Sequence, residues 1–122
     1  NANREICNDT IKLIAELMRL SEDFYIHVAD NTYVYYMEKK ARVNEICDLL
    51  EMKLYGMDNA SELLQKTTEY CTSIWEQKPT SEKEEERREK IKRKSSELRC
   101  LTQKFCNGIL IIGESSLHDS EK

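Results

Sequence analysis

The side chains of this 122-residue chain that are best suited to covalent chemistry are its thiols and imidazoles. They number five cysteines and two histidines: Cys7, Cys47, Cys71, Cys100, Cys106, His27 and His118. A thiol beside an imidazole can become a nucleophile, and the sequence offers His27 with Cys7 or Cys47 for this role. All five cysteines have apolar neighbours, however, and buried thiols in apolar surroundings are mostly inert. We therefore predict no catalytic residue.

Metal and cofactor chemistry finds equally little support. A zinc site built on Cys100 and Cys106 would need further ligands, and six-residue spacing places the two thiols on different sides of a helix. Structural zinc sites favour two to four intervening residues. The chain contains no CxxC, Glu-x-x-His, HExxH, GxSxG, GxGxxG or GxxxxGK motif. We expect no bound metal or cofactor, and the sequence indicates that the protein is not an enzyme.

Tyrosines are the more informative polar residues. Tyr25, Tyr33, Tyr35 and Tyr36 all fall within residues 24–36. Adjacent side chains on a helix cannot all face one core, and tyrosine is enriched among interface anchors. We therefore take Tyr33, Tyr35 and Tyr36 as candidates for a protein-binding surface. The alternative is that they line the rim of the core with solvated hydroxyls.

A charged run, SEKEEERREKIKRKSSE, occupies residues 81–97. Its charges fall at i,i+4 spacing with the acid first, as in Glu84 and Arg88, which favours a self-stabilised, solvated helix. The basic part, residues 87–94, is an alternative contact for nucleic acid. Its glutamates and its lack of an aromatic residue for base stacking make that partner the less favoured one.

The elements that position these residues are helices. Apolar side chains recur every three or four positions, as in the broad stripe that contains Cys7, Ile11, Ile14 and Met18. A stripe of that width predicts contact with at least two other helices. We predict helices at about residues 4–29, 33–55, 60–77 and 82–107. Gly56 suits a left-handed helix stop, and Asn59 suits a cap of the third helix.

Residues 24–36, FYIHVADNTYVYY, also fit a β-hairpin that turns at Asp30-Asn31. Its arms are rich in β-branched and aromatic residues, which favour strands. Such residues cost a helix at most about 0.7 kcal/mol each. Burying one of their side chains contributes about 1.5 to 3 kcal/mol. We therefore favour two helices with a corner at Asp30-Asn31-Thr32.

The fourth predicted helix carries a single apolar seam. Ile91, Leu98 and Phe105 are seven residues apart, with Leu101 between them, and these four are further candidates for a protein interface. We expect the helix to end near Asn107. The predicted domain spans residues 1–113, followed by a disordered tail over residues 114–122.

The amino-acid composition and net charge agree with an all-α antiparallel bundle of three to four helices with coiled-coil-like packing. Charged residues make up 34% and glycine and proline are scarce, which favours helices with solvated faces over sandwiches or barrels. The net charge of −4 attracts neither nucleic acid nor an anionic membrane. No apolar run is long enough to span a bilayer.

Together these features predict a non-enzymatic interaction or assembly module that binds another protein or a second copy of itself as a homodimer. The odd number of cysteines fits reduced thiols, so we expect a cytoplasmic or nuclear protein. The alternative is a secreted helical ligand of the cytokine type. Two glycosylation sequons, Asn8-Asp9-Thr10 and Asn59-Ala60-Ser61, give that alternative weak support.

Overall fold

The computed structural model describes residues 2–27, 33–76 and 83–120, except for the side chains of Tyr33 and of residues 112–120. These residues form α1 (Ala2–Ile26), α2 (Tyr33–Leu54), α3 (Ala60–Cys71), the π-helical turn η1 (Thr72–Glu76) and α4 (Glu84–Ser120). No strand occurs among the described residues. The predicted all-α fold is therefore confirmed.

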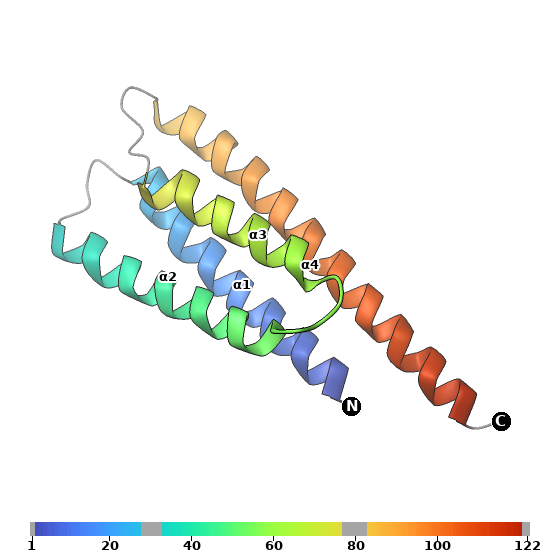
Figure 1. Ribbon diagram of the computed structural model, residues 1–122. Coiled ribbons are helices and arrows are strands. Elements are labelled where there is room, and N and C mark those ends of the chain that lie inside the picture. The colour runs from blue at the N-terminus through green and yellow to red at the C-terminus, as the bar shows by residue number, and fades with distance from the viewer. Residues whose placement is uncertain (1, 28–32, 77–82, 121–122) are drawn as a thin grey trace.

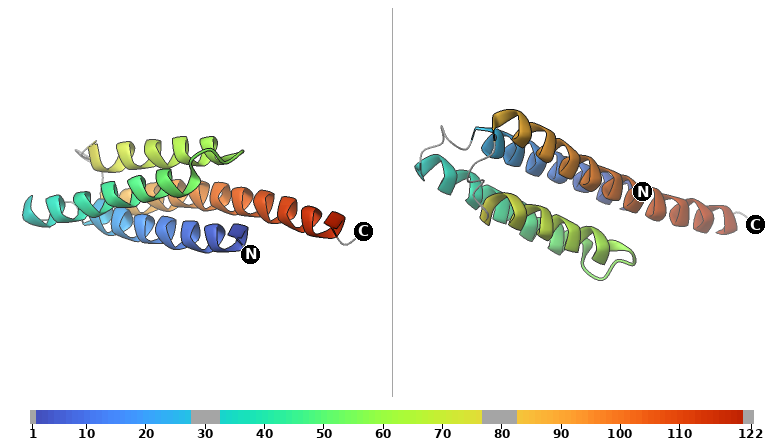
Figure 2. Two further views of the ribbon diagram at one scale, coloured as in Figure 1. Left: turned by 60° about the horizontal axis from the view of Figure 1, so that its bottom comes forward. Right: turned by 90° about the horizontal axis from the view of Figure 1, so that it is seen from above.

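Successive helices run in opposite directions and pack as an antiparallel bundle (Figure 1). α1 and α3 each contact both α2 and α4, while η1 continues α3 and also contacts α1. This is the up-down-up-down arrangement that short connections between helices produce. The last turns of α4 extend past the start of α1, as the two turned views show (Figure 2).

Residues 24–36 divide between two helices. Phe24 and Tyr25 lie in the last turn of α1 and are only 3% and 2% exposed, while Tyr36 lies in the first turn of α2. Residues 28–32, which contain the predicted Asp30-Asn31 corner, lie outside the described residues. The hairpin alternative is wrong because residues 24–26 and 33–36, which would belong to its two arms, are helical. Burial of the aromatic side chains outweighs their small preference for strands.

The broad apolar stripe of α1 meets several partners, as predicted. α1 packs against α2, α4 and η1, and Cys7, Ile14 and Met18 are buried. Ile11 belongs to the predicted stripe but is 43% exposed. The centre of the buried face is displaced toward Thr10, and Ile11 consequently lies at its edge.

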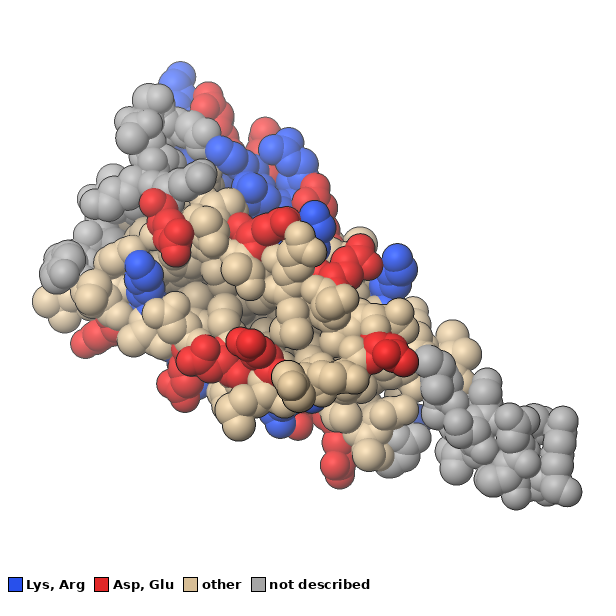
Figure 3. Space-filling view, in the orientation of Figure 1, with Lys and Arg blue, Asp and Glu red and all other residues tan. Residues whose placement is uncertain are grey.

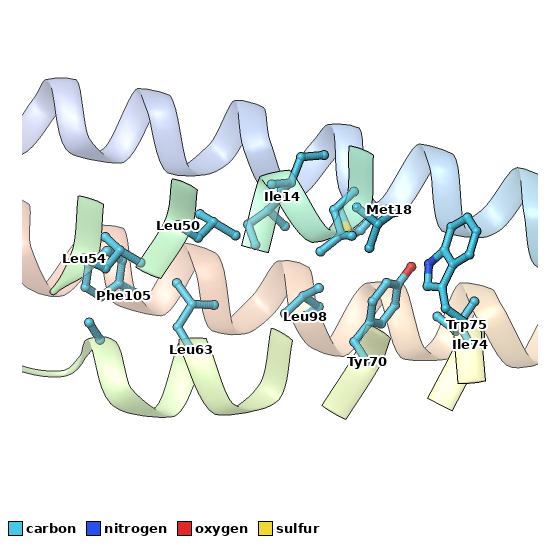
Figure 4. Close-up of a cluster of buried hydrophobic side chains, with 14 of the residues drawn as sticks. Ile14, Met18, Leu50, Leu54, Leu63, Tyr70, Ile74, Trp75, Leu98 and Phe105 are labelled. Carbon is cyan, nitrogen blue, oxygen red and sulfur yellow. The ribbon is translucent and has the colours of Figure 1, made fainter. Parts of the chain in front are cut away.

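A hydrogen-bonded group of side chains crosses the core near η1. The Trp75 ring stacks on Phe24 with centroids 4.3 Å apart, and its Nε1 donates to Ser21 Oγ at 2.9 Å. The hydroxyls of Tyr70 and Ser95 lie 2.8 Å apart. Figure 4 shows Tyr70 and Trp75 pointing between the helices among aliphatic side chains. These contacts connect α1, α3 with η1, and α4, and they satisfy polar groups that would be costly to bury alone.

Left-handed backbone conformations form the turn between α2 and α3. Gly56 has φ 75°, which confirms it as the predicted stop after α2. Asn59 occupies the N-cap position of α3 with φ 71°, but its side chain makes no capping hydrogen bond. Asparagine tolerates this conformation better than most residues. It therefore acts through its backbone rather than as the predicted side-chain cap.

α4 passes Asn107 and Gly108 without a break and continues to Ser120, so the predicted end near Asn107 is wrong. A glycine within a helix costs about 1 kcal/mol relative to alanine. Ile109, directly after it, is only 4% exposed, and its carbonyl accepts a hydrogen bond from Asn3 Nδ2 at 3.0 Å. The free energy gained by packing Ile109 against α1 thus exceeds the cost of a glycine within the helix. The backbone of residues 114–120 is helical where we predicted a tail, and residues 121–122 lie outside the described residues.

Thr10 is fully buried, and its hydroxyl has no hydrogen-bond partner among the described residues. We expect Thr10→Val to raise the free energy of unfolding by about 1 kcal/mol, because an unsatisfied hydroxyl is replaced by a methyl group of similar shape. Urea denaturation monitored by circular dichroism measures this change.

Two matched controls test the explanation. The hydroxyls of the buried Thr67 and Thr102 donate to Leu63 O at 2.7 Å and Leu98 O at 2.8 Å. Replacing either threonine with valine should lower stability by about 1 kcal/mol. A Thr10→Val protein that loses as much would contradict the assignment of an unpaired hydroxyl.

Candidate functional site

The predicted tyrosine candidates fasten the start of α2 to the rest of the bundle. Tyr36 Oη donates to the Trp75 carbonyl at 2.9 Å, and Tyr35 Oη donates to the Asp23 carboxylate. The hydrogen bond to Asp23, assisted by burial, raises the pKa of Tyr35. The side chain of Tyr33 lies outside the described part of the structure. The two described hydroxyls are therefore engaged within the chain.

The candidate seam of α4 lies inside the bundle. Ile91, Leu98 and Phe105 are 0%, 2% and 4% exposed. Leu101 is half-buried and packs against the same core. In this structure the seam contacts the chain's own helices rather than a separate partner.

Large apolar side chains are instead exposed on α2 and in the residue that follows it. Val34, Met37, Met52 and Tyr55 are 65%, 46%, 76% and 85% exposed, which sequence reasoning did not anticipate. Scattered exposed apolar residues are ordinary, but a group on one side of one element indicates an interaction surface.

The four side chains share one side of α2. Val34 and Met52 are 18 residues apart, as are Met37 and Tyr55, and 18 residues make five helical turns. The core-facing Ile46 and Leu54 lie on roughly the opposite side of the helix, at 0% and 1% exposure. α2 thus carries two pairs of exposed apolar side chains near its two ends, with Asn44 and Asp48 between them on the same side. We call this side, about 30 Å long, the outer face.

Acidic side chains flank the outer face. Glu38, Asp48 and Glu51 are exposed, and no ion pair involves them within residues 2–27, 33–76 and 83–120. Asp48 and Glu51 line a hollow together with Met52 and Tyr55. In the space-filling view, acidic groups gather along the lower part of the molecule, where α2 lies (Figure 3). The outer face therefore combines apolar contact area with negative charge.

Two cations of α2 are bound to its neighbour. Arg42 Nη2 lies 2.8 Å from Glu16 Oε1, and Lys53 Nζ lies 3.1 Å from Asp9 Oδ2, so both reach α1. The hydrogen bond from Arg42 lowers the pKa of the Glu16 carboxyl group. Arg42 Nη1 also lies 2.9 Å from Glu45 Oε1 of α2, whereas Glu38, Asp48 and Glu51 take part in none of the ion pairs of the described residues.

Comparison with protein-family models, curated proteins and solved structures finds no match for this chain. The function of this chain must therefore be inferred from its own residues. Within the part of the chain that the structure describes, no helix is long and apolar enough to cross a bilayer.

The cysteines approach one another between helices, which the sequence did not reveal. Cys47 Sγ on α2 lies 3.6 Å from Cys71 Sγ at the end of α3. Cys7 Sγ on α1 lies 3.7 Å from the Cys106 carbonyl on α4. Burial, followed by a hydrogen bond with the Cys7 thiol, raises the pKa of Cys106 to about 12. Cys100 is exposed and has no such neighbour among the described residues.

The structure does not assemble the other chemical combinations that the sequence offered. Cys7 and His27 are at opposite ends of the α1 region, 20 residues or about 30 Å apart, so they cannot form a nucleophilic dyad. Cys100 is exposed while Cys106 is buried toward Cys7. No cluster of three potential metal ligands occurs among the described residues.

The basic part of the charged run is partly used inside the bundle. Arg87 donates from Nε and Nη2 to the Ile26 carbonyl, at 3.3 and 3.0 Å, and so caps the end of α1. Arg88 Nη2 lies 2.9 Å from Glu84 Oε1, as the predicted i,i+4 pairing requires. Ile91 is completely buried. These engagements reduce the charge that residues 87–94 could offer to phosphates.

A hollow of about 750 Å³ lies between α3, η1 and α4. Lys66, Arg93 and Lys94 contribute positive charge to its rim, while Glu69 and Glu97 contribute negative charge. Lys66 Nζ already lies 3.2 Å from Glu69 Oε2. The mixed rim does not select an anion or a cation, so the hollow defines no ligand class.

A signal for the outer face was present in the sequence. Apolar residues at 34, 37, 52 and 55 do not fit the stripe of Val43, Ile46, Leu50 and Leu54. A helix with apolar residues on two opposite sides has more than one surface to cover. We selected Tyr35 and Tyr36 because of their residue type. The helical spacing instead indicates their sequence neighbours Val34 and Met37 as exposed apolar residues.

Proposed function

We propose that this domain is a non-enzymatic protein-interaction module and that its partner presents a cationic amphipathic helix to the outer face of α2. The observation that supports this proposal is the two exposed apolar pairs, Val34 with Met37 and Met52 with Tyr55, on one side of α2 beside unpaired carboxylates. A helix laid along this side would bury apolar side chains against both pairs, and its lysines or arginines would meet the acidic groups.

The expected complex is weak and transient. Complete burial of four large apolar side chains contributes at most about 6 to 12 kcal/mol. Association costs about 4 to 15 kcal/mol in lost freedom of movement. Even the most favourable combination of these ranges leaves about 8 kcal/mol, which corresponds to a dissociation constant of about 1 μM, so the affinity is micromolar at best. Such affinity is typical of partners that bind and separate.

A second copy of the chain is a poorer occupant of the outer face than a cationic partner. A symmetric dimer brings the same surface of both copies together. Glu38, Asp48 and Glu51 of one copy would then approach those of the other, and like charges in contact disfavour association. Homodimerisation remains an outcome that the size of the protein in solution would reveal.

The proposal can be tested with a synthetic helical peptide that carries leucines on one side and lysines and arginines on the other. We expect micromolar binding by fluorescence anisotropy at low salt, weakening as salt rises because the charged rim is screened. The variant Met52→Lys should weaken binding by about tenfold or more, because it removes apolar contact and places a positive charge against the cationic peptide. Circular dichroism checks that the variant remains helical.

Ile111→Lys is the matched control, because Ile111 is 61% exposed but lies on α4. This substitution adds the same charge to a comparably exposed apolar position and should leave peptide binding unchanged. The proposal fails if wild-type protein does not bind at low salt, or if Ile111→Lys weakens binding as much as Met52→Lys. Light scattering that shows a stable dimer would assign the outer face to a second copy.

A secreted helical ligand, recognised by a receptor through a helix face, is the second candidate function. The close approach of four cysteines in two pairs favours it, and both sequon residues Asn8 and Asn59 are exposed. Mass spectrometry of the protein from its native source separates the candidates. Two disulfides or a glycan would indicate secretion. Five thiols would support our first proposal, a module of the cytoplasm or nucleus.

A further inference from the structure

We infer that Cys47 and Cys71 form a disulfide site, at which a low-molecular-weight disulfide oxidises the two thiols and links α2 to α3. Their sulfur atoms are 3.6 Å apart although the residues are 24 positions apart in the sequence. A disulfide bond measures about 2.05 Å, so the sulfur atoms need to approach by only about 1.5 Å. This inference is independent of the interaction proposed for the outer face.

The site is accessible to a small oxidant. Cys47 and Cys71 are both half-buried rather than fully enclosed. Cys47, with Glu51, Leu64 and Thr68, lines a groove of about 230 Å³ between α2 and α3. An oxidant can therefore reach Cys47 without unfolding of the bundle.

The two thiols differ in acidity in a way that fits an attacking and a resolving cysteine. The hydrogen bond from the Cys71 thiol lowers the pKa of Cys47, against the smaller opposing effects of burial and the Asp48 charge. Donating that hydrogen bond, together with burial, raises the pKa of Cys71. The thiolate is the reactive form of cysteine, so Cys47 is the better first nucleophile.

The reaction proceeds by two thiol–disulfide exchanges. The Cys47 thiolate attacks one sulfur of the external disulfide, forms a mixed disulfide and releases one small thiolate. Cys71 then loses its proton, attacks the Cys47 sulfur and expels the second small thiolate. The two protein thiols lose two electrons in total, the external disulfide gains them, and the two released protons complete two small thiols.

The Cys7 and Cys106 thiols provide an internal comparison. They are also neighbours, but at 3% and 2% exposure they are closed to solvent. Cys7–Cys106 oxidation therefore requires local opening of α1 and α4, and it should be slower than Cys47–Cys71 oxidation in the folded protein.

The test uses the full chain with Cys100→Ser, which removes the exposed thiol and prevents linkage between molecules. The folded protein is incubated with oxidised glutathione and sampled over time, and the remaining thiols are alkylated before peptide mapping by mass spectrometry. We expect a peptide pair joined through Cys47 and Cys71, formed at least about tenfold faster than one joined through Cys7 and Cys106.

Two variants identify the order of attack. With Cys71→Ser, the mixed disulfide between glutathione and Cys47 should accumulate because no resolving thiol is present. With Cys47→Ser, Cys71 should remain largely unmodified. The inference is overturned if no Cys47–Cys71 linkage forms while the protein stays folded, or if the buried Cys7–Cys106 linkage forms first.

Discussion

Leu98→Asp is expected to leave the domain unfolded at room temperature. Leu98 is 2% exposed and belongs to the core that all four helices share. Removing a buried leucine side chain costs about 2 to 5 kcal/mol, and a buried carboxylate without a partner adds several more. A domain of this size is stable by about 5 to 15 kcal/mol, so most or all of its stability is lost. Circular dichroism and thermal unfolding measure the result.

Met52→Asp is the control for this prediction because it adds the same carboxylate to a helix position that is 76% exposed. Surface substitutions of this kind change stability by about 0.5 kcal/mol or less. We expect the Met52→Asp protein to remain helical and nearly as stable as the wild-type protein. A folded Leu98→Asp protein would show that the α4 seam does not lie in the core.

The fold could be predicted because burial and periodicity agree along most of the chain. Val43, Ile46, Leu50 and Leu54 recur at helical spacing in the sequence, and all four are buried on one side of α2. Residues 24–36 posed the hardest local choice, and side-chain burial decided it against strand propensity. These features depend on neighbours within one or two turns, which a sequence displays directly.

The features that the sequence did not reveal depend on which helices are neighbours. Cys47 and Cys71 approach one another only because α2 packs beside α3, and no spacing rule reports that contact. The helix end near Asn107 was predicted from local preferences, but the burial of Ile109 against α1 overrode them. Arg87 was predicted to belong to a solvated charged run, but in the bundle it donates a hydrogen bond to the Ile26 carbonyl at the end of α1.

The roles of the interface candidates also depend on which helices are neighbours. Residue type drew attention to Tyr35 and Tyr36, yet the bundle uses both hydroxyls to hold α2 in place. The seam of Ile91, Leu98 and Phe105 was predicted to be a candidate protein interface, but these three side chains are buried in the chain's own core. Once these internal contacts are assigned, the large apolar side chains of α2 that stay exposed in the described structure are those of the outer face.

Oxidation of Cys47 and Cys71 is expected to raise the free energy of unfolding by about 3 to 4 kcal/mol. The linkage would close a loop of about 25 residues in the unfolded chain, which lowers the entropy of that state. The helices of the folded state need little movement to accommodate it, since the sulfur atoms are already 3.6 Å apart. Urea denaturation of the Cys100→Ser protein, with and without a reducing agent, measures the difference.

Replacing both Cys47 and Cys71 with serine in the Cys100→Ser protein provides the control, because neither the linkage nor a mixed disulfide can then form at these positions and the unfolding midpoint should be the same with or without a reducing agent. The denaturant slope should fall slightly on oxidation, since a cross-linked unfolded chain exposes less surface. If oxidation lowered the stability of the Cys100→Ser protein, the helices would have to be strained by the linkage. If oxidation raised the stability instead, the disulfide would form between α2 and α3 without strain. It would then link α2, the helix that carries the outer face, to α3.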